Sequence, residues 1–561
     1  MDRYRPALTR GWALLLAAPP LVFLSLFFLW PVANILALGL APQGQLALGH
    51  VLETWTRPFV LDTVVFTLAL AGLSTLLTLA LGLPAAWVFA RFDFPLKRPA
   101  RALTVVPFVL PTVVVGSAFL ALLGPRSPLN ALGTALFGEA FPQVRLDGSV
   151  EAILIAHVFY NMAVVIRMVG GLWAHLDPRT EEAARMLGAS ATRAFREVTW
   201  PLLRPAVISA ASIVFLFTVT SFGVVLLLGG PRDTTLEVEI YRQTAILLDL
   251  PTAAALTILQ MGGVFVLLLA RARAQEGLAV QQRLRGALET ARRPRPGRER
   301  ALVAGILGFT VLFMFVPLAV LVERALAGPD GFGLAAFGSL LEADPRTRLT
   351  AAPWASVLAS LRFALATTLI AGSLGLMAAL VVGYRRGWLA RGLDALVMLP
   401  LGTSAVIVGF GFLVSLDTPP LDLRTSVLLI PIAHALIALP FVLRSVVPVV
   451  RSIDDRLREA AAVLGASPRR AWWEVDGPIL ARAALVGAGF AFAVSLGEFG
   501  ATLFIARPDT VTIPVAIFRL LGQPGAANFT TAMALAVVLM VLTASAVLLI
   551  ERLRGGGPQP F

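Results

Sequence analysis

Cysteine is absent from this 561-residue chain, and lysine is reduced to Lys97. Without cysteine, the chain has no disulfide, no thiolate metal site and no cysteine nucleophile. A phosphate-binding loop of the G-x-x-x-x-G-K-[ST] type needs a lysine directly after glycine, but Lys97 follows Leu96. A nucleotide-binding loop of this kind is therefore excluded.

Charged residues are also few, at 14% of the chain, while 58% of the residues are hydrophobic. A chain this apolar belongs in a bilayer. Roughly 20 apolar residues in a helix cross about 30 Å of hydrocarbon. Twelve runs of this kind are present: 12–39, 62–90, 102–123, 150–172, 204–229, 252–270, 301–326, 355–383, 392–416, 426–450, 479–505 and 528–550.

The formal net charge is +13, and its placement separates a nucleic-acid surface from membrane topology. Most of the basic residues gather in alternate loops, among them 167–204, 271–300 and 444–482. Basic residues stay on the cytoplasmic side of a membrane. We therefore expect an inner-membrane protein of a prokaryote, with both termini in the cytoplasm, lipid around its spans and no nucleic-acid partner.

The chain repeats itself. The segment from Ile155 to Pro201 recurs at a constant offset of 277 residues, and upstream the offset becomes 293, so the first half carries 16 extra residues between its third and fourth spans. Six spans per half is an even number, which predicts a parallel repeat. We expect an all-α polytopic fold with permease domains at 1–274 and 301–561, joined by a charged cytoplasmic linker at 275–300.

The loop after the fourth span has the same local pattern in both halves. Asp177 followed by Pro178 predicts a helix start, and Gly188 predicts its end. Ser190 predicts the cap of a second helix that reaches about Trp200, before Pro201 opens the next span. Residues 454–478 repeat this pattern, so each loop is expected to form a helix-turn-helix at the membrane surface.

These loops resemble the coupling motif of the permeases of ATP-binding-cassette (ABC) importers: glutamate-alanine-alanine, then glycine, then proline. The matching residues are Glu182, Ala183, Ala184, Gly188 and Pro201 in the loop 177–201, and Glu459, Ala460, Ala461, Gly465 and Pro478 in the loop 454–478. The resemblance implies a type I ABC-importer permease fold. It also implies two separate ATP-binding subunits, expected as a homodimer, and an extracytoplasmic solute-binding protein. ATP and Mg²⁺ would be used by those subunits, with no cofactor on this chain.

The resemblance extends to the fused permeases of thiamine and ferric-iron importers. Residues 155–161, 221–223 and 229–241 look most like the thiamine branch, whereas Ser495 to Ala501 is shared in kind by iron, molybdate and sulfate permeases. Thiamine is the expected cargo and ferric iron the alternative. An ion-coupled secondary transporter is a further alternative, but it would not need paired coupling loops.

Polar residues inside spans are costly and usually face a cavity or another helix. On this ground Asn161, Gln260, Arg362 and Glu498 are the candidates for the translocation pathway. The carboxylate of Glu498 would suit a cationic cargo; the alternative is that Glu498 pairs with Arg362 or caps a broken helix.

His157 and His434 occupy equivalent positions in the two repeats. Common descent of the halves explains this recurrence, so no metal site is assigned to them. No nucleophile or His–carboxylate cluster falls within the predicted spans, and no catalytic residue is assigned.

Overall fold

The computed structural model describes residues 9–554, except 43, 105, 126, 139–140, 144, 277–289, 329–330, 344–348 and 418–420. Half of the predicted linker, residues 277–289, therefore lies outside the described residues. In the first part of the chain the α-helices are α1 Arg10–Leu24, α2 Trp30–Leu40, α3 Leu48–Thr56, α4 Pro58–Arg91, α5 Lys97–Leu103, α6 Val106–Val109, α7 Thr112–Leu123, α8 Pro128–Phe137, α9 Val150–His175, α10 Pro178–Met186, α11 Ala191–Ala194, α12 Trp200–Val219, α13 Gly223–Leu228, α14 Leu236–Ala245 and α15 Leu250–Glu276.

The second part begins with α17 Arg298–Leu326, and a short antiparallel pair, β1 Ala327–Gly328 and β2 Gly331–Phe332, follows it. The remaining α-helices are α18 Ala335–Gly338, α19 Trp354–Tyr384, α20 Trp388–Gly402, α21 Ala405–Ser415, α22 Leu429–Ser452, α23 Asp455–Val463, α24 Pro468–Ala471, α25 Gly477–Gly497, α26 Gly500–Ile505, α27 Ile513–Leu521 and α28 Ala526–Arg554. Single turns of π-helix at Ser25–Leu29, Phe195–Thr199 and Trp472–Asp476, and a 3-10 turn at Ser339–Leu341, complete the described elements.

Eleven helices in the described residues are long and apolar enough to cross a membrane, or up to twelve if one bent pair counts as a span. This confirms the predicted polytopic all-α fold. The bent pair is α20 and α21, which meet at 98°. The matching run at 102–123 is likewise broken into α5, α6 and α7. Its last break falls at Pro111, which has no backbone N–H to continue the hydrogen-bond ladder.

The fifth span of each half is shorter than predicted. The expected runs 204–229 and 479–505 stop at Val219 and Gly497, and short helices α13 and α26 follow each break. In the second half, the Glu498 carboxylate accepts hydrogen bonds from the first backbone N–H groups of α26. These local bonds satisfy the new helix start, so the chain bends where hydropathy alone predicts a continuous span.

Two compact units make up the fold, and they do not follow the two sequence repeats. Among the described residues, one unit holds residues 9–54, 240–258 and 325–554, and the other holds residues 55–239 and 259–324. The first span of each repeat is thus grouped with the helices of the other repeat. Hydropathy and repeat offset do not encode this exchange.

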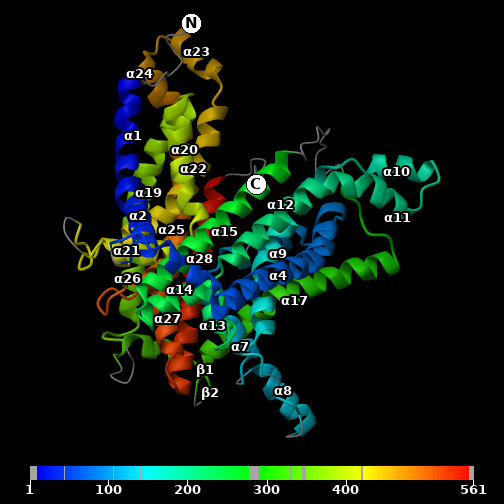
Figure 1. Ribbon diagram of the computed structural model, residues 1–561. Helices are drawn as coiled ribbons and strands as arrows, with labels where there is room; N and C mark the ends of the chain where they lie inside the picture. Colours follow the sequence, from blue (N-terminus) through cyan, green and yellow to red (C-terminus); the bar gives the residue numbers. More distant parts are fainter. Residues whose placement is uncertain are drawn as a thin grey trace. The chain divides into compact units, whose positions relative to one another are not determined.

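In the unit that contains the second repeat, α1 packs along α19 and α20, and α2 packs along α21 (Figure 1). Phe27 and Phe412 bring their rings to 6.3 Å. Gly411 lets the helices approach closely, because a Cβ there would lie 3.0 Å from the Pro31 side chain. A large apolar core joins α1 to α19, α22 and α25.

In the other unit, α4 packs along α9 and α12 around Ala86, Val165 and Val214. The exchanged helix here is α17, whose Phe313 stacks edge-on against Phe159 with ring centres 6.2 Å apart. The chain before α17 is fixed as well, since the N–H of Asp93 donates to the carbonyl of Arg292 over 2.9 Å.

Candidate functional site

Both predicted helix-turn-helix loops are present. In the first, hereafter coupling loop 1 (177–201), the Asp177 carboxylate accepts from the N–H of Arg179 at 3.0 Å and begins α10. Gly188 has a φ of +92°, which ends that helix. The Ser190 hydroxyl then accepts from the N–H of Arg193 at 3.3 Å and begins α11.

Coupling loop 2 (454–478) repeats this geometry. Asp454 caps α23 with a 3.0 Å bond from the N–H of Arg456, and Gly465 has a φ of +84°. Ser467 caps α24 at 3.3 Å from the N–H of Arg470. The same caps at the same spacing give two copies of one surface hairpin.

One detail differs from the prediction. The second helix of each loop does not stop before the following proline, because α11 runs through a π-helical turn into α12, and α24 does the same into α25. The proline therefore lies inside a continuous helix, next to the widened turn. A π-turn leaves the local hydrogen-bond ladder irregular, which reduces the cost of the missing proline N–H. Each coupling loop is thus joined directly to its fifth span.

The tips of the two hairpins are apolar and exposed. Met186 and Leu187 are 89% and 90% exposed, and their repeat partners Val463 and Leu464 are both 87% exposed. These are the highest exposures among the large hydrophobic residues that the structure describes. Apolar side chains this open, on otherwise charged helices, make the tips candidate contact surfaces.

The glutamate and alanines of the coupling motif lie on α10 and α23, the helices that lead to these tips. Glu182, Ala183, Gly188 and Pro201 are exposed and Ala184 is half-buried. In the second loop, Glu459, Ala460, Gly465 and Pro478 are likewise exposed, and Ala461 is half-buried. No residue of α10 is buried. The helix that carries the first motif is therefore accessible and does not form part of a core.

The bases of the two hairpins are held by different chemistry. In coupling loop 2, Arg458 and Asp476 are 5% and 0% exposed. The Arg458 Nε donates to both Asp476 oxygens at 3.1 and 3.0 Å, and Nη2 adds a third bond at 2.5 Å. The Tyr384 hydroxyl donates to the same carboxylate at 3.2 Å. These hydrogen bonds to Asp476 raise the pKa of the Arg458 guanidinium above its ordinary value.

At the corresponding positions, coupling loop 1 has Glu181 and Thr199. The Thr199 hydroxyl donates a single hydrogen bond of 2.9 Å to the Glu181 carboxylate. Glu181 is half-buried, whereas Arg458 is buried. The two loops therefore share their backbone geometry but not the strength of their anchors.

The repeated histidines tie the fourth span to the break after the fifth. His434 Nδ1 lies 2.7 Å from the Ser495 hydroxyl, and its Nε2 lies 2.7 Å from the Thr502 hydroxyl and 3.1 Å from the Glu498 carboxylate. His157 Nε2 lies 2.9 Å from the Ser221 hydroxyl, at the position equivalent to Glu498. Both histidines bond to side chains of their own unit. The described part of the chain holds no group of three or more metal-ligating side chains.

The four predicted pathway residues lie on different elements: α9, α15, α19 and the break between α25 and α26. Asn161 is buried on α9, and its amide donates to the His157 carbonyl at 3.0 Å. Gln260, buried on α15, donates to the Glu237 carboxylate. Arg362 is exposed on α19. Glu498 caps α26, which is the helix-cap alternative raised from the sequence.

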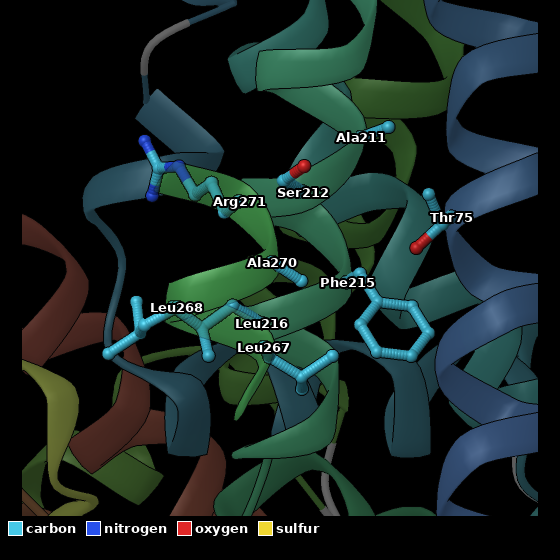
Figure 2. Close-up of a pocket in the computed structure, with 9 residues that line it drawn as sticks. All are labelled: Thr75, Ala211, Ser212, Phe215, Leu216, Leu267, Leu268, Ala270 and Arg271. Carbon is cyan, nitrogen blue, oxygen red and sulfur yellow. The ribbon is translucent and has the colours of Figure 1, made fainter. Parts of the chain in front are cut away.

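A cavity of about 370 Å³ opens between α4, α12 and α15, as Figure 2 shows. Phe215 lies on the α4 side, near Thr75, and Arg271 lies on the opposite side. The hydroxyls of Thr75 and Ser212 bond to carbonyls of their own helices. The walls are therefore mainly apolar, and none of the four predicted pathway residues lines them.

Comparison with known proteins decides the family. The family of binding-protein-dependent transport system inner membrane components matches residues 78–275 and 371–554, which is more than half of the chain. The chain belongs to this family. It is an ABC-importer permease with both halves in one polypeptide, and a multi-pass membrane protein.

Several relatives of this permease span nearly its full length. The thiamine transport system permease protein ThiP of Brucella abortus (strain 2308) is 27% identical over 502 residues, covering 88% of each chain. ThiP of Escherichia coli (strain K12) is 26% identical over 513 residues, covering 89% of this chain and 90% of the relative. A solved bacterial ABC transporter involved in the import of the acidic polysaccharide alginate aligns with 48% of this chain and 97% of its own, at 16% identity and a TM-score of 0.42.

Two features of the permease escaped the sequence analysis. The exposed tips carry a signal in the sequence, since an apolar pair directly before the helix-ending glycine recurs at offset 277. The Arg458–Asp476 pair has no such signal. Its partners are 18 residues apart, and the first repeat has different residues at both positions.

Proposed function

We propose that this permease imports thiamine, delivered by an extracytoplasmic solute-binding protein. The supporting observation is that relatives covering about nine-tenths of the chain, from Brucella and Escherichia coli, carry the name thiamine transport permease. The resemblance of residues 221–223 and 229–241 to the thiamine branch points the same way. The binding protein follows from the family, whose members are components of binding-protein-dependent systems.

Transport is proposed to be driven by a pair of separate ATP-binding subunits, one bound to each coupling loop. These subunits use ATP and Mg²⁺. The motif residues Glu182, Ala183 and Ala184, with Glu459, Ala460 and Ala461, would line the contact. The exposed pairs Met186–Leu187 and Val463–Leu464 would enter apolar pockets of the subunits. Burying such side chains contributes about 1.5–3 kcal/mol each, enough to make the tips central to docking.

The orientation follows from the same reasoning. The coupling loops must face the ATP-binding subunits, so both termini lie in the cytoplasm and the loops around 124–150 and 327–354 face outward. On that outer side the binding protein would dock. The placement of arginine in alternate loops supports this orientation.

The proposed pathway includes Asn161, Gln260, Arg362 and Glu498. Asn161 and Gln260 are buried, and within the described residues Oδ1 of Asn161 and Oε1 of Gln260 accept no hydrogen bond. Such oxygens offer sites to a polar or cationic cargo. Both oxygens of Glu498 are already bonded, so its proposed part is to hold the bend in the pathway wall.

The cargo is tested by calorimetric titration of the partner binding protein with thiamine and with chelated ferric iron. We expect saturable heat with thiamine and none with the iron chelate. Uptake of radiolabelled thiamine by proteoliposomes containing the assembled importer should then depend on ATP. Tight iron binding with no response to thiamine would overturn the cargo and leave the importer architecture intact.

Docking of the ATP-binding subunits is tested by Leu187→Asp and Leu464→Asp. A charge at either tip should prevent its burial, so the amount of ATP-binding subunit that co-purifies with the permease should fall about tenfold or more. Phe332→Asp is the control, because Phe332 is 75% exposed but lies on β2. Equal retention by all three variants would contradict docking at the tips.

A further inference from the structure

The two fifth spans, α12 and α25, hold equivalent places in the repeat, but their ends are fixed differently. Each begins at a coupling loop and ends at the break before a short helix. In α25 both ends are held by buried carboxylates, Asp476 at the start and Glu498 at the finish, which are 0% and 6% exposed. In α12 the same positions are Thr199 and Ser221, which offer only a hydroxyl each.

At the start of α25, the guanidinium of Arg458 joins the coupling helix α23 to the span through three hydrogen bonds to one carboxylate. A bidentate guanidinium–carboxylate pair fixes orientation as well as distance. Tyr384 of α19 adds a bond to the same carboxylate, so three helical segments meet at Asp476. At the start of α12, the Thr199 hydroxyl donates one hydrogen bond to the half-buried Glu181 carboxylate, and this carboxylate also interacts electrostatically with the Arg91 guanidinium at the end of α4.

At the end of α25, the Glu498 carboxylate binds the N–H groups of Ala501 and Thr502 at 2.7 and 3.0 Å. It also contacts His434 at 3.1 Å, which connects it to α22. Ser221, at the end of α12, makes one contact of 2.9 Å to His157. The second-half span is therefore tied to its neighbours at both ends by several directional bonds.

Because α25 is bonded to neighbouring segments at both ends, it is expected to move together with those segments. Breaking one partner of a buried ion pair leaves an uncompensated charge, which costs far more than losing a neutral hydrogen bond. Sliding α23 along α25 would break the Arg458–Asp476 pair, whereas a similar shift of α10 along α12 would stretch a single hydroxyl bond. The two links thus differ in the resistance they offer to relative movement.

We infer that Arg458, Asp476 and Tyr384 are positioning residues that make α25 the stiff transmitting helix of the importer, with α12 as the compliant one. This rests on the proposed role of the coupling loops in receiving movement from the ATP-binding subunits. Movement of coupling loop 2 then reaches the bend at Glu498 without loss, while movement of coupling loop 1 is partly absorbed at Thr199. The two halves are consequently unequal in coupling, although their coupling loops have the same backbone geometry.

The test measures cargo molecules transported per ATP hydrolysed, using the complete importer in proteoliposomes with its binding protein. Asp476→Asn should lower this ratio at least about tenfold, since Arg458 loses the charge of its buried partner and keeps only its pair with the exposed Asp455 carboxylate. Thr199→Val, the matched change in the first repeat, should lower it less than about twofold. ATP hydrolysis and retention of the ATP-binding subunits should persist in both variants.

Two further variants separate positioning from folding. Tyr384→Phe removes the hydroxyl group and with it the bonds to Asp476 and to the Trp472 side chain. It should lower the ratio about two- to fivefold with no change in the melting temperature. The exchange Arg458→Glu with Asp476→Thr installs the first-repeat pair in the second loop and should recover part of the ratio lost in Asp476→Asn.

Two outcomes would overturn the inference: equal ratios in Asp476→Asn and Thr199→Val, or an unchanged ratio in Tyr384→Phe. These results are distinct from failure of the proposed function. In that case the ATP-binding subunits would not bind the unaltered permease, or its uptake would not require ATP.

Discussion

Single glycines set the shape of the coupling loops. Gly188 and Gly465 have positive φ, and neither has an atom within 4 Å of the place where a Cβ would stand. Space is therefore not what requires glycine. The requirement is conformational, because other residues pay about 1–2 kcal/mol in the left-handed region.

Gly465→Ala is expected to loosen coupling loop 2. The strain should raise local opening, so amide hydrogen exchange in α23 should quicken roughly 5- to 30-fold. Exchange measured by mass spectrometry checks this. Gly392→Ala is the control, because Gly392 lies inside α20 with equally open surroundings and no positive φ. Equal exchange in both variants would contradict the conformational argument.

At the same scale, sequence reasoning succeeded where chemistry is local. The caps Asp177, Ser190, Asp454 and Ser467 were all predicted, since each interacts with residues two or three positions away. Arg458 could not be paired in advance with Asp476, because only the folded hairpin brings them together. The same holds for the contact of His434 with Glu498, which joins residues 64 positions apart.

Helix elements pack closely where the repeat places glycine. A Cβ at Gly375 would lie 2.6 Å from Cγ1 of Val442, and a Cβ at Gly82 would lie 2.9 Å from Val165, its repeat equivalent. The second and fourth spans of each half therefore touch through glycine and valine. A larger residue must push the two helices apart.

Gly375→Ala should destabilise the permease by about 1–3 kcal/mol, the usual cost of overpacking. Its effect is read as a lower melting temperature of the purified protein. Gly372→Ala changes the same helix one turn away, at a site with nothing within 4 Å, and should leave the melting temperature unchanged or slightly higher. Adding Val442→Ala should partly rescue Gly375→Ala; a failure to rescue would argue against this contact.

The number of membrane-spanning helices was predictable from the sequence, but the breaks within them were not. Hydropathy locates apolar runs, so the count of spans was close to the structure. The bends at Thr403 and after Gly497 were missed because hydropathy does not register capping bonds, and Ser404 and Glu498 each cap the helix that follows. A polar residue inside an apolar run is the signal that was available.

For the whole molecule, the exchange of first spans means that each compact unit contains residues from both repeats. The internal repeat was visible in the sequence, and the family match supports it. The exchange was not visible, because lipid-facing and protein-facing apolar surfaces are similar in composition. The contacts of α1 and α2 with α19 and α21, and of Phe313 on α17 with Phe159, reveal it.

Cutting the chain between residues 280 and 281 should therefore leave two fragments that hold together. A tag on the second fragment should recover the first, since α1 and α2 pack into the unit of the second repeat and α17 packs into the other. Deleting residues 1–54 from the first fragment should reduce this recovery. Unchanged recovery after the deletion would show that α1 and α2 do not contribute to holding the fragments together.

The exchanged first span also determines how the protein must be made. Residues of α1 leave the ribosome long before their packing partners in α19, which follow more than 300 residues later. At typical rates of synthesis of about 5–20 residues per second, that interval is on the order of tens of seconds. Throughout it, α1 must remain in the bilayer as a single helix, stable without its neighbours. The exposed, strongly apolar surface of α1 is compatible with lipid contact during this interval. The first unit to be completed is the one that contains α17, not the one that contains α1.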